Sequence, residues 1–352
     1  MILYLPGGLM QIRNEIEERE DIFLSPYAVR SKNSKGRDKK EKEDSIRTCF
    51  QRDRDRILHC KAFRRLKHKT QVFISPVEDH YRTRITHTLE VSQIARTIAR
   101  ALCLNEDLTE AIALGHDLGH TPFGHAGEDV LNDILKTIDV APKRYFMHNE
   151  QSVRVVEVLE KGGKGLNLTW EVRDGILHHP QKDKQLPATL EGQIVRYADH
   201  IAYIRHDIED SIFAGVIKKK DLPKEHTKIL GENILDSIIP NIIEKSRNKN
   251  RIQMDKRVED AMNGLYDFLY KRVYTSPTAK GEEKKIPVMI TQLFKYYHEN
   301  PEKLPYYKKT WKEVDIVQSI VDFIAGMTDR YAINKFTEIF VPNEWHANIS
   351  IK

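Results

Sequence analysis

Apolar residues recur at intervals of three and four positions along most of this chain, the spacing that gathers side chains on one face of an α-helix. In residues 86–104, THTLEVSQIARTIARALCL, such a stripe contains Leu89, Val91, Ile94, Ala95, Ile98 and Leu102. Alternation of apolar and polar residues, which marks half-buried strands, is scarce, and QVFIS at residues 71–75 is the one tempting run. The sequence therefore predicts an all-α protein.

The same periodicity, read with residues that start and stop helices, predicts further helices. One covers residues 109–117, with Asp107 or Thr109 as its N-cap and Gly119 as its stop. The others cover residues 149–160, 170–178, 190–214, 229–246, 258–273, 287–298 and 316–330. The alternating charges of QRDRDRI, residues 51–57, are expected to form ion pairs on a solvated helix, with oligomer contacts or an effector site as sharper alternatives.

Length and charge indicate how these helices are grouped. With 352 residues, the chain could form two domains or one elaborated domain. Residues 30–47 carry many charges and almost no apolar side chain, so residues 1–47 are expected to form a partly flexible arm. A core is predicted over residues 48–215, and a linker near residue 216 could separate it from a C-terminal helical region, residues 216–352.

Several classes of protein are disfavoured by the sequence. The three cysteines, Cys49, Cys60 and Cys103, form no CxxC pair, which argues against a disulfide scaffold and against a thiolate zinc site. The apolar start lacks a basic leader, and no segment approaches the roughly 20 apolar residues of a membrane helix. These features predict a cytoplasmic protein with no membrane partner. A formal net charge of +5 is too small to mark a dedicated nucleic-acid-binding protein.

The segment ALGHDLGHTPFGHAGE, residues 113–128, concentrates ionisable side chains where glycines and a proline should prevent a regular helix. His116 and Asp117 offer an imidazole and a carboxylate, which together suit a divalent transition ion or magnesium. The alternative is a histidine at a helix end beside an aspartate that bonds to the backbone. Because a catalytic site also keeps positions open for water and substrate, two further protein ligands are required.

Two residues elsewhere are candidates for these ligands. His87 opens the helix predicted in residues 86–104, where it could equally be a packed core residue. Asp199, Tyr203 and His206 lie roughly opposite the apolar stripe of the segment 190–214, which contains Ile194, Ile201, Ile208 and Ile212. An amphipathic surface helix would show the same pattern, but a tyrosine within the polar stripe favours the lining of a cavity.

The order His87, His116-Asp117, Asp199 resembles the H…HD…D signature of the HD-domain phosphohydrolases. Other segments resemble one branch of them, the deoxyguanosinetriphosphate triphosphohydrolase (dGTPase) family: TCFQRDRDRILHCKAFRRLKHKTQVF (48–73), YRTRITHTLEVSQIARTIARAL, HDLGHTPFGHAGE, HNEQS (148–152), YADHIAYIRHDIEDSI and DFIAGMTDRYA (322–332). These segments span nearly the whole chain. The resemblance implies an HD-domain catalytic core whose four signature residues bind a divalent metal ion, Mg²⁺, Mn²⁺ or Fe²⁺.

The resemblance also implies roles for residues around the metal. His125 would be the catalytic histidine beside the α-phosphate, and Glu128 would orient it or help to activate water, because a carboxylate on one ring nitrogen raises the basicity of the other. Arg84 and His120 would contact phosphate oxygens. A capping interaction within the loop is the alternative for the His125–Glu128 pair, and a surface position is the alternative for Arg84.

Further matches fall in the expected substrate pocket. Gln71 resembles the residue that reads the deoxyribose 3'-hydroxyl, and Tyr203 resembles a tyrosine near the sugar, where a 2'-hydroxyl would clash. The remaining matches are His148 and Asp207 in the pocket and, near the base or at a subunit boundary, Asp329 and Tyr331. Plain packing or surface roles remain open for these residues.

The activity implied by the resemblance is hydrolysis of deoxynucleoside triphosphates, of dGTP or more broadly, to a deoxynucleoside and inorganic tripolyphosphate. A homo-oligomer, hexamer or tetramer, and weak binding of single-stranded nucleic acid are further implications. One alternative within the superfamily is a nucleoside monophosphate phosphatase or cyclic-nucleotide phosphodiesterase with the same ligands. Another is a nucleotide- or nucleic-acid-binding regulator with a vestigial metal site, which the basic segment of residues 30–42 would favour.

Overall fold

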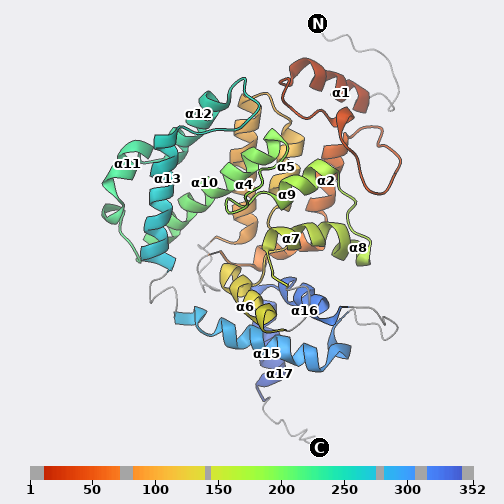
Figure 1. The fold of residues 1–352 in the computed structure, drawn as a ribbon, viewed down its shortest axis with the longest axis vertical. Coiled ribbons are helices and arrows are strands. Elements are labelled where there is room, and N and C mark those ends of the chain that lie inside the picture. Colours follow the sequence, from red (N-terminus) through yellow and green to blue (C-terminus); the bar gives the residue numbers. More distant parts are fainter. Residues whose placement is uncertain (1–11, 72–81, 139–143, 275–280, 306–314, 343–352) are drawn as a thin grey trace, which may run out of the picture.

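The computed structural model describes residues 12–71, 82–138, 144–274, 281–305 and 315–342, and Figure 1 shows that helices make up its architecture. Within those ranges no strand is formed, and extended residues pair only at two isolated bridges, Arg37 with Thr169 and Thr70 with Thr83. The predicted all-α class is confirmed. Of the QVFIS run, Gln71 is a bend, and residues 72–75 lie outside the described residues.

Most predicted helices form close to their expected bounds. These are α4 (Arg84–Ala101), α5 (Glu106–Gly115), α7 (His148–Arg154), α9 (Trp170–Leu177), α10 (Leu190–Phe213), α13 (Lys256–Leu269) and α15 (Ile286–Glu299). After α7 the chain continues through a π-helical turn, Val155–Leu159, into α8 (Glu160–Gly163). The expected N-cap of α5 was wrong: Asn105 caps this helix, because its side chain accepts a hydrogen bond from the Leu108 amide.

Two predicted helices are interrupted. Residues 229–246 were predicted as one helix, but Gly231, with a φ of 75°, separates α11 (Lys224–Leu230) from α12 (Ile234–Ser246). Residues 316–330 were predicted as one helix, but α16 (Ile316–Ala325) ends at Ala325, and α17 (Asp329–Phe340) begins where the Thr328 side chain accepts a hydrogen bond from the Tyr331 amide. Helices α1 (Ile12–Phe23), α3 (Lys61–Arg65), α6 (Gly124–Thr137) and most of α17 were not predicted.

The buried apolar side chains form two clusters. The larger cluster joins α2 (Cys49–Leu58), α4, α5, α9 and α10, and it continues into α12 and α13. The smaller cluster joins α6 to α15, α16 and α17, which form the lower layer in Figure 1. Because the larger cluster runs past residue 216 and the smaller one includes α6, packing alone marks no boundary at that residue, and the predicted division into domains stays a prediction.

The segment between α1 and α2 is irregular but attached to the core. Arg37 forms an ion pair with Asp53 and donates a hydrogen bond to the Asn167 carbonyl at 2.6 Å. Ser34 donates to the Glu171 carboxylate at 2.8 Å. The prediction of ion pairs along α2 is confirmed, but a solvated position is wrong for Asp53, which is fully buried. In the described part of the chain, no helix is long and apolar enough to cross a membrane.

Candidate active site

Side chains from two helices and the turn that follows a third meet at one buried point. His87 lies in α4, His116 and Asp117 directly follow α5, and Asp199 lies in α10. The His87 Nε2 is 3.0 Å from the Asp199 Oδ1, and the His116 Nε2 is 3.5 Å from the Asp117 Oδ1 and 3.7 Å from the Asp199 Oδ1. The structure therefore brings together the four residues that the sequence predicted as metal ligands.

The chemistry of these donors fits a divalent cation. The His116 Nδ1 donates to the Ala113 carbonyl at 2.7 Å, which leaves the lone pair on Nε2, and this buried Nε2 has no hydrogen-bond partner among the described residues. Burial would raise the pKa of Asp117, but the charges of His116 and Arg84 outweigh it and hold that pKa well below its usual range. The pKa of Asp199 is lowered too, chiefly by its hydrogen bond with His87. Two carboxylates and imidazole nitrogen suit magnesium, manganese or iron.

The helix α10 is buried on both sides, which excludes the alternative of an ordinary surface helix. Ile194 and Ile201 on one side are fully buried. On the other side, His206 is buried with its ring centroid 5.3 Å from that of His87, while the Asp199 side chain is 25% exposed. This exposure leaves the carboxylate reachable from outside.

The turn after Asp117 packs tightly against α7. A Cβ atom on Gly119 would lie 2.2 Å from the backbone nitrogen of Ser152, so only glycine fits there. The Ser152 hydroxyl accepts a hydrogen bond from the Gly119 amide at 2.9 Å and donates to the His116 carbonyl at 2.7 Å. These contacts hold the backbone of residues 116–119 against α7.

The second half of the histidine-rich segment is helical, which corrects the expectation of an irregular turn. Phe123 adopts a left-handed conformation with a φ of 62°, and α6 begins at the next residue. The helix forms despite Gly124 and Gly127 because its apolar side, with Val130, Leu131 and Leu135, is buried in the smaller cluster. His125 and Glu128 therefore lie in the first two turns of a helix.

His120, His125, Glu128 and His148 form a second group, whose possible ligand atoms all lie within 4.8 Å of one another. The Glu128 Oε2 is 3.4 Å from the His125 Nδ1 and 3.1 Å from the His148 Nδ1. The His120 and His148 rings stack with centroids 4.6 Å apart, whereas the His125 side chain is 61% exposed. Glu128 is thus shared by the exposed His125 and the half-buried His148.

The electrostatics of this group separate the histidines. Burial, with Arg84 nearby, lowers the pKa of His120 well below its usual value, so His120 is neutral at neutral pH. Burial also lowers the pKa of His148, but the hydrogen bond with Glu128 outweighs it and raises that pKa. Burial would raise the pKa of Glu128, but its hydrogen bonds with His125 and His148 bring it far below the usual range. Glu128 is therefore an ionised carboxylate.

Arg84 is not a surface arginine. It is buried, and its Nη1 lies 2.7 Å from the Asp117 Oδ2. Its Nη2 lies 3.2 Å from the place that a Cβ atom of Gly124 would occupy, beside the start of α6. The guanidinium thus lies between a predicted metal ligand and the helix that carries His125, where its predicted contact with phosphate stays a prediction.

Three more residues were predicted to line the substrate pocket, Gln71 and Tyr203 at the sugar and Asp207 elsewhere in it. The Gln71 Nε2 is buried without a hydrogen-bond partner in the described residues. The backbone carbonyl oxygen of Gln71 is 3.2 Å from the position that a Cβ atom of Gly124 would occupy. Tyr203 and Asp207 lie one turn apart on α10; Asp207 is buried, and the half-buried Tyr203 ring has its centroid 6.1 Å from that of Tyr266 in α13. Their contacts with substrate stay predictions.

Asp329 and Tyr331 begin α17 but differ in exposure. The Asp329 carboxylate is buried and accepts hydrogen bonds from the Thr70 amide at 3.0 Å and from the Phe123 amide at 2.9 Å. Tyr331 is 40% exposed, and its ring centroid is 6.4 Å from that of Phe323. A contact of either residue with the base stays a prediction.

Sequence reasoning missed two buried residues beside the site. His179 lies two residues after the end of α9, and its Nε2 lies 3.4 Å from the His148 Nε2. Burial lowers the pKa of His179 to about 3. Asp117, His148 and His179 also place possible ligand atoms within 4.8 Å of one another. Lys69 is fully buried behind the turn, and burial lowers its pKa to about 7. Neither His179 nor Lys69 was assigned a role of its own by a motif or by a periodic pattern, so the sequence offered no reason to select either residue.

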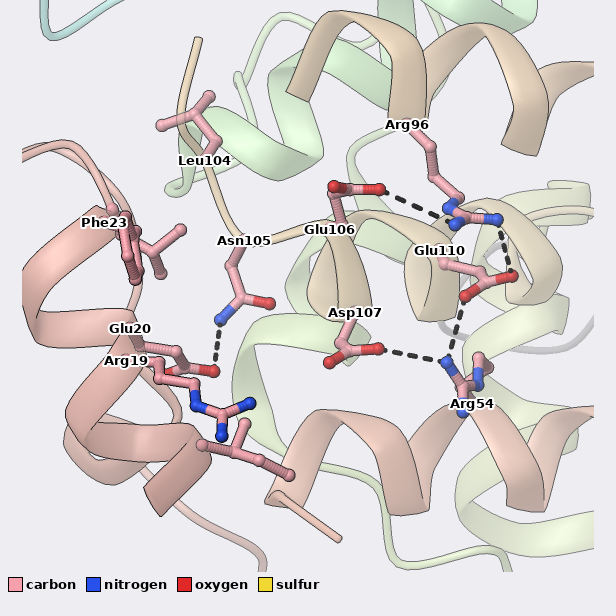
Figure 2. A pocket seen from close by; sticks show the side chains of 12 residues that line it. Arg19, Glu20, Phe23, Arg54, Arg96, Leu104, Asn105, Glu106, Asp107 and Glu110 are labelled. Carbon is pink, nitrogen blue, oxygen red and sulfur yellow. Dashed lines mark hydrogen bonds and ion pairs between the residues drawn. The ribbon is translucent and has the colours of Figure 1, made fainter. Parts of the chain in front are cut away.

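A separate open cavity of about 380 Å³ lies between α1, α2 and α5. Figure 2 shows that several of its side chains are paired: Arg54 contacts Asp107 at 3.0 Å and Glu110 at 3.2 Å, and Asn105 donates to Glu20. The cavity contains none of the histidines described above. Its lining carries the acidic Glu20, Glu106, Asp107 and Glu110 and the basic Arg19, Arg54 and Arg96, and most of these groups are bound to one another.

Comparison with known proteins agrees with this geometry. The HD domain model matches residues 84–204, and the phosphohydrolase-associated domain model matches residues 252–338. A deoxyguanosinetriphosphate triphosphohydrolase-like protein of Caldanaerobacter subterraneus subsp. tengcongensis is 55% identical over 342 residues, covering 96% of this chain and 98% of that one. Proteins of the same description are 46% identical in Clostridium tetani, covering 95% and 97%, and 48% identical in Clostridium perfringens (strain 13 / Type A), covering 95% and 98%.

Proposed function

The chain belongs to the deoxyguanosinetriphosphate triphosphohydrolase-like family of HD-domain phosphohydrolases, and on this premise we propose that it converts deoxynucleoside triphosphates to deoxynucleoside and tripolyphosphate. At the coarser level the family makes it a metal-dependent phosphohydrolase. Relatives carry the name of the dGTP reaction, but the substrate and products of this chain are our proposal. The observation that supports it most strongly is the meeting of His87, His116, Asp117 and Asp199 beside the group of His125 and Glu128.

The protein residues divide the work of binding and proton transfer. We assign His87, His116, Asp117 and Asp199 to the divalent cation, which when bound would withdraw charge from the α-phosphate as a Lewis acid. Arg84 and His120 would hold phosphate oxygens, since a guanidinium fork and a neutral imidazole can both donate hydrogen bonds to them. Gln71, Tyr203, Asp207 and His148 would enclose the sugar and phosphates, and Tyr331 would lie near the base.

In the hydrolytic step, a water oxygen attacks the α-phosphorus, and the bond from that phosphorus to the 5'-oxygen breaks. The electron pair of the broken bond stays on the 5'-oxygen, which must gain a proton to leave as the deoxynucleoside hydroxyl. His125 is the residue we assign to that proton transfer, because it is the exposed histidine of its group and Glu128 lies 3.4 Å from its Nδ1. The attacking water gives up one proton as its oxygen bonds to phosphorus, which balances the proton gained by the 5'-oxygen, and the water oxygen ends in the tripolyphosphate.

A product assay tests this proposal. Each of the four deoxynucleoside triphosphates, alone and in mixtures, is incubated with the protein and Mn²⁺ or Mg²⁺, and the metal content is measured on the same sample. Tripolyphosphate as the first phosphorus-containing product is the expected result. Pyrophosphate or orthophosphate as the first product would refute the reaction, and hydrolysis of monophosphates or cyclic nucleotides alone would favour the phosphatase or phosphodiesterase alternative.

Assembly and further partners stay predictions of family resemblance. A homo-oligomer, hexamer or tetramer, is expected, and sedimentation velocity would measure its size. Weak binding of single-stranded nucleic acid would appear as salt-sensitive retention of an oligonucleotide. Retention without hydrolysis of any nucleotide would instead support the regulator with a vestigial metal site.

A further inference from the structure

We propose that Asp329, at the start of α17, is a positioning residue that holds the turn of His120 and the first turn of α6 in their reactive arrangement. The proposal rests on the proposed function for its kinetic part and on hydrogen bonds for its structural part. It assigns the C-terminal helices a direct part in the geometry of the active site. Asp329 would act through the backbone segments that it holds.

Three segments that are distant in sequence meet behind the active site. They are residues 69–71, residues 120–124 and the α16–α17 turn at residues 325–329. Asp329 joins all three, because its Oδ1 accepts a hydrogen bond from the Phe123 amide at 2.9 Å and its Oδ2 accepts from the Thr70 amide at 3.0 Å and from the Thr70 hydroxyl. One side chain thus satisfies donors from the other two segments.

Lys69 makes a second connection among the same segments. Its buried ammonium donates to the His120 carbonyl and, at 2.8 Å, to the Ala325 carbonyl. The His120 carbonyl belongs to the turn between α5 and α6, and the Ala325 carbonyl belongs to the end of α16. A buried ammonium with two fixed acceptors restricts movement of one backbone past the other.

The residue held by Asp329 is the one that sets the direction of α6. Phe123 is a non-glycine residue with a left-handed φ of 62°, a conformation that is unfavourable unless its surroundings impose it. Its side chain is buried in the smaller cluster, and its amide is held by Asp329. Since α6 begins at the next residue, a relaxed Phe123 would move His125 and Glu128 relative to His120.

The experiment uses the full-length protein with the substitution Asp329→Asn. Asparagine has one carbonyl oxygen, so its amide group must face either the Phe123 amide or the Thr70 donors, and one connection is lost. Amide hydrogen exchange in residues 118–128 is expected to rise by roughly tenfold, as for loss of one buried hydrogen bond. With dNTP as substrate, kcat should fall on the order of 100-fold while KM and metal content change little.

A second pair of variants keeps the test decisive if Asp329→Asn does not fold. Thr70→Val removes only the hydroxyl donor to Asp329, and Thr70→Ser restores it. We expect Thr70→Val to lower kcat and raise exchange in residues 118–128, and Thr70→Ser to behave as the wild-type protein. Equal behaviour of the two Thr70 variants would overturn the proposal.

Asp322→Asn is the matched control, because Asp322 also joins the C-terminal helices to the rest of the protein. Its carboxylate pairs with Arg154 of α7 at 2.7 Å and accepts a hydrogen bond from Gln151 at 3.0 Å, and among the described residues it bonds to none of residues 120–124. This variant should lower the melting temperature but leave kcat within about twofold of wild type. An equal fall of kcat in Asp322→Asn and Asp329→Asn would show that any loosening of the C-terminal helices suffices and would overturn the specific role of Asp329.

The exchange measurement also separates this proposal from the proposed function. If the wild-type protein releases tripolyphosphate from no deoxynucleotide, the proposed function fails, but faster exchange in residues 118–128 of Asp329→Asn would still support the positioning contact. If the wild-type protein is active and neither exchange nor kcat changes in Asp329→Asn, the positioning role fails alone.

Discussion

The Nη1 of Arg84 lies 2.7 Å from the Oδ2 of Asp117, and both side chains are buried. Arg84 begins α4, three residues before His87, while Asp117 follows α5, so this pair joins the ends of two helices at the predicted metal centre. A bound divalent cation would offer the same carboxylate a second source of positive charge. Stability should therefore depend jointly on the arginine and on the cation.

We expect Arg84→Met to destabilise the metal-free protein more than the metal-loaded protein. Removing one partner of a buried ion pair costs about 3–5 kcal/mol of unfolding free energy, because it leaves an uncompensated charge. Urea unfolding in EDTA should show a loss of this order, and saturating Mn²⁺ should reduce it. Arg96→Met, on the exposed side of α4, is the control, with an expected loss below about 1 kcal/mol in both conditions. Equal losses for Arg84→Met with and without Mn²⁺ would contradict this prediction.

His125 and Asp117 are expected to differ in what their replacement removes. His125→Ala should keep the metal content and lose turnover by about 100-fold or more, because a proton-transfer residue contributes at least that factor. Asp117→Ala should lose both metal and turnover. The comparison needs metal analysis and tripolyphosphate release on the same samples. His298→Ala, an exposed histidine on α15, should change neither quantity, and normal turnover by His125→Ala would rule out its assigned role.

Gly119 should not tolerate alanine. Its added Cβ would lie 2.2 Å from the Ser152 nitrogen and 2.3 Å from the Gln151 carbonyl carbon, and backbone atoms cannot rotate away as a side chain can. We expect Gly119→Ala to lose about 1–3 kcal/mol of unfolding free energy, and turnover with it. Gly281→Ala, where none of the described residues lies within 4 Å of the added carbon, is the control and should retain both. A fully stable and active Gly119→Ala would mean that the turn sits farther from α7 than described.

Glu191 should make stability depend on pH near neutrality. It is fully buried at the start of α10, and burial raises its pKa to about 7 from 4.5, against hydrogen bonds from the Asn105 and Val29 amides. A raised folded-state pKa means that the stabilising contribution is complete below about pH 4.5 and is lost as the pH rises through about 7.

Glu191→Gln should remove this dependence, since glutamine keeps the acceptor and cannot ionise. The unfolding free energy of the variant relative to wild type should rise by about 3 kcal/mol between about pH 5 and pH 8, measured by urea unfolding. Replacing the exposed Glu282 by glutamine should leave the pH profile unchanged. Parallel profiles for wild type and Glu191→Gln would show that Glu191 is ionised throughout.

The sequence predicted the helical class because periodicity is local in the chain. It predicted the meeting of His87, His116, Asp117 and Asp199 because their order resembles the H…HD…D signature of the HD-domain phosphohydrolases. It did not predict α6, since glycines and a proline weaken the local helix signal and the stabilising contacts come from α15, more than 150 residues away. Tertiary burial decided the conformation there.

Residues with structural partners were also hidden from sequence analysis. Asp53 looks like one charge in an alternating run, but its partners are Arg37 and Thr169, and the Thr169 amide donates to it at 2.8 Å. Lys69 looks like one cation in the basic run RRLKHK, yet it is fully buried. Contacts between residues far apart in the sequence produce no periodic pattern, so the burial of Asp53 and Lys69 could not be predicted from the sequence.

The position of α6 within the smaller cluster bears on how this protein could be divided. A fragment ending near residue 215 would keep His87, His116, Asp117 and Asp199 but would expose Val130, Leu131 and Leu135, which α15–α17 cover in the whole chain. Such a fragment should bind metal weakly, aggregate through α6 and turn over no substrate by itself. It would also lose α12 and α13, which complete the larger cluster. Activity should therefore return only on mixing it with a separately produced piece containing residues 216–342, and split-protein complementation would report on both apolar contacts.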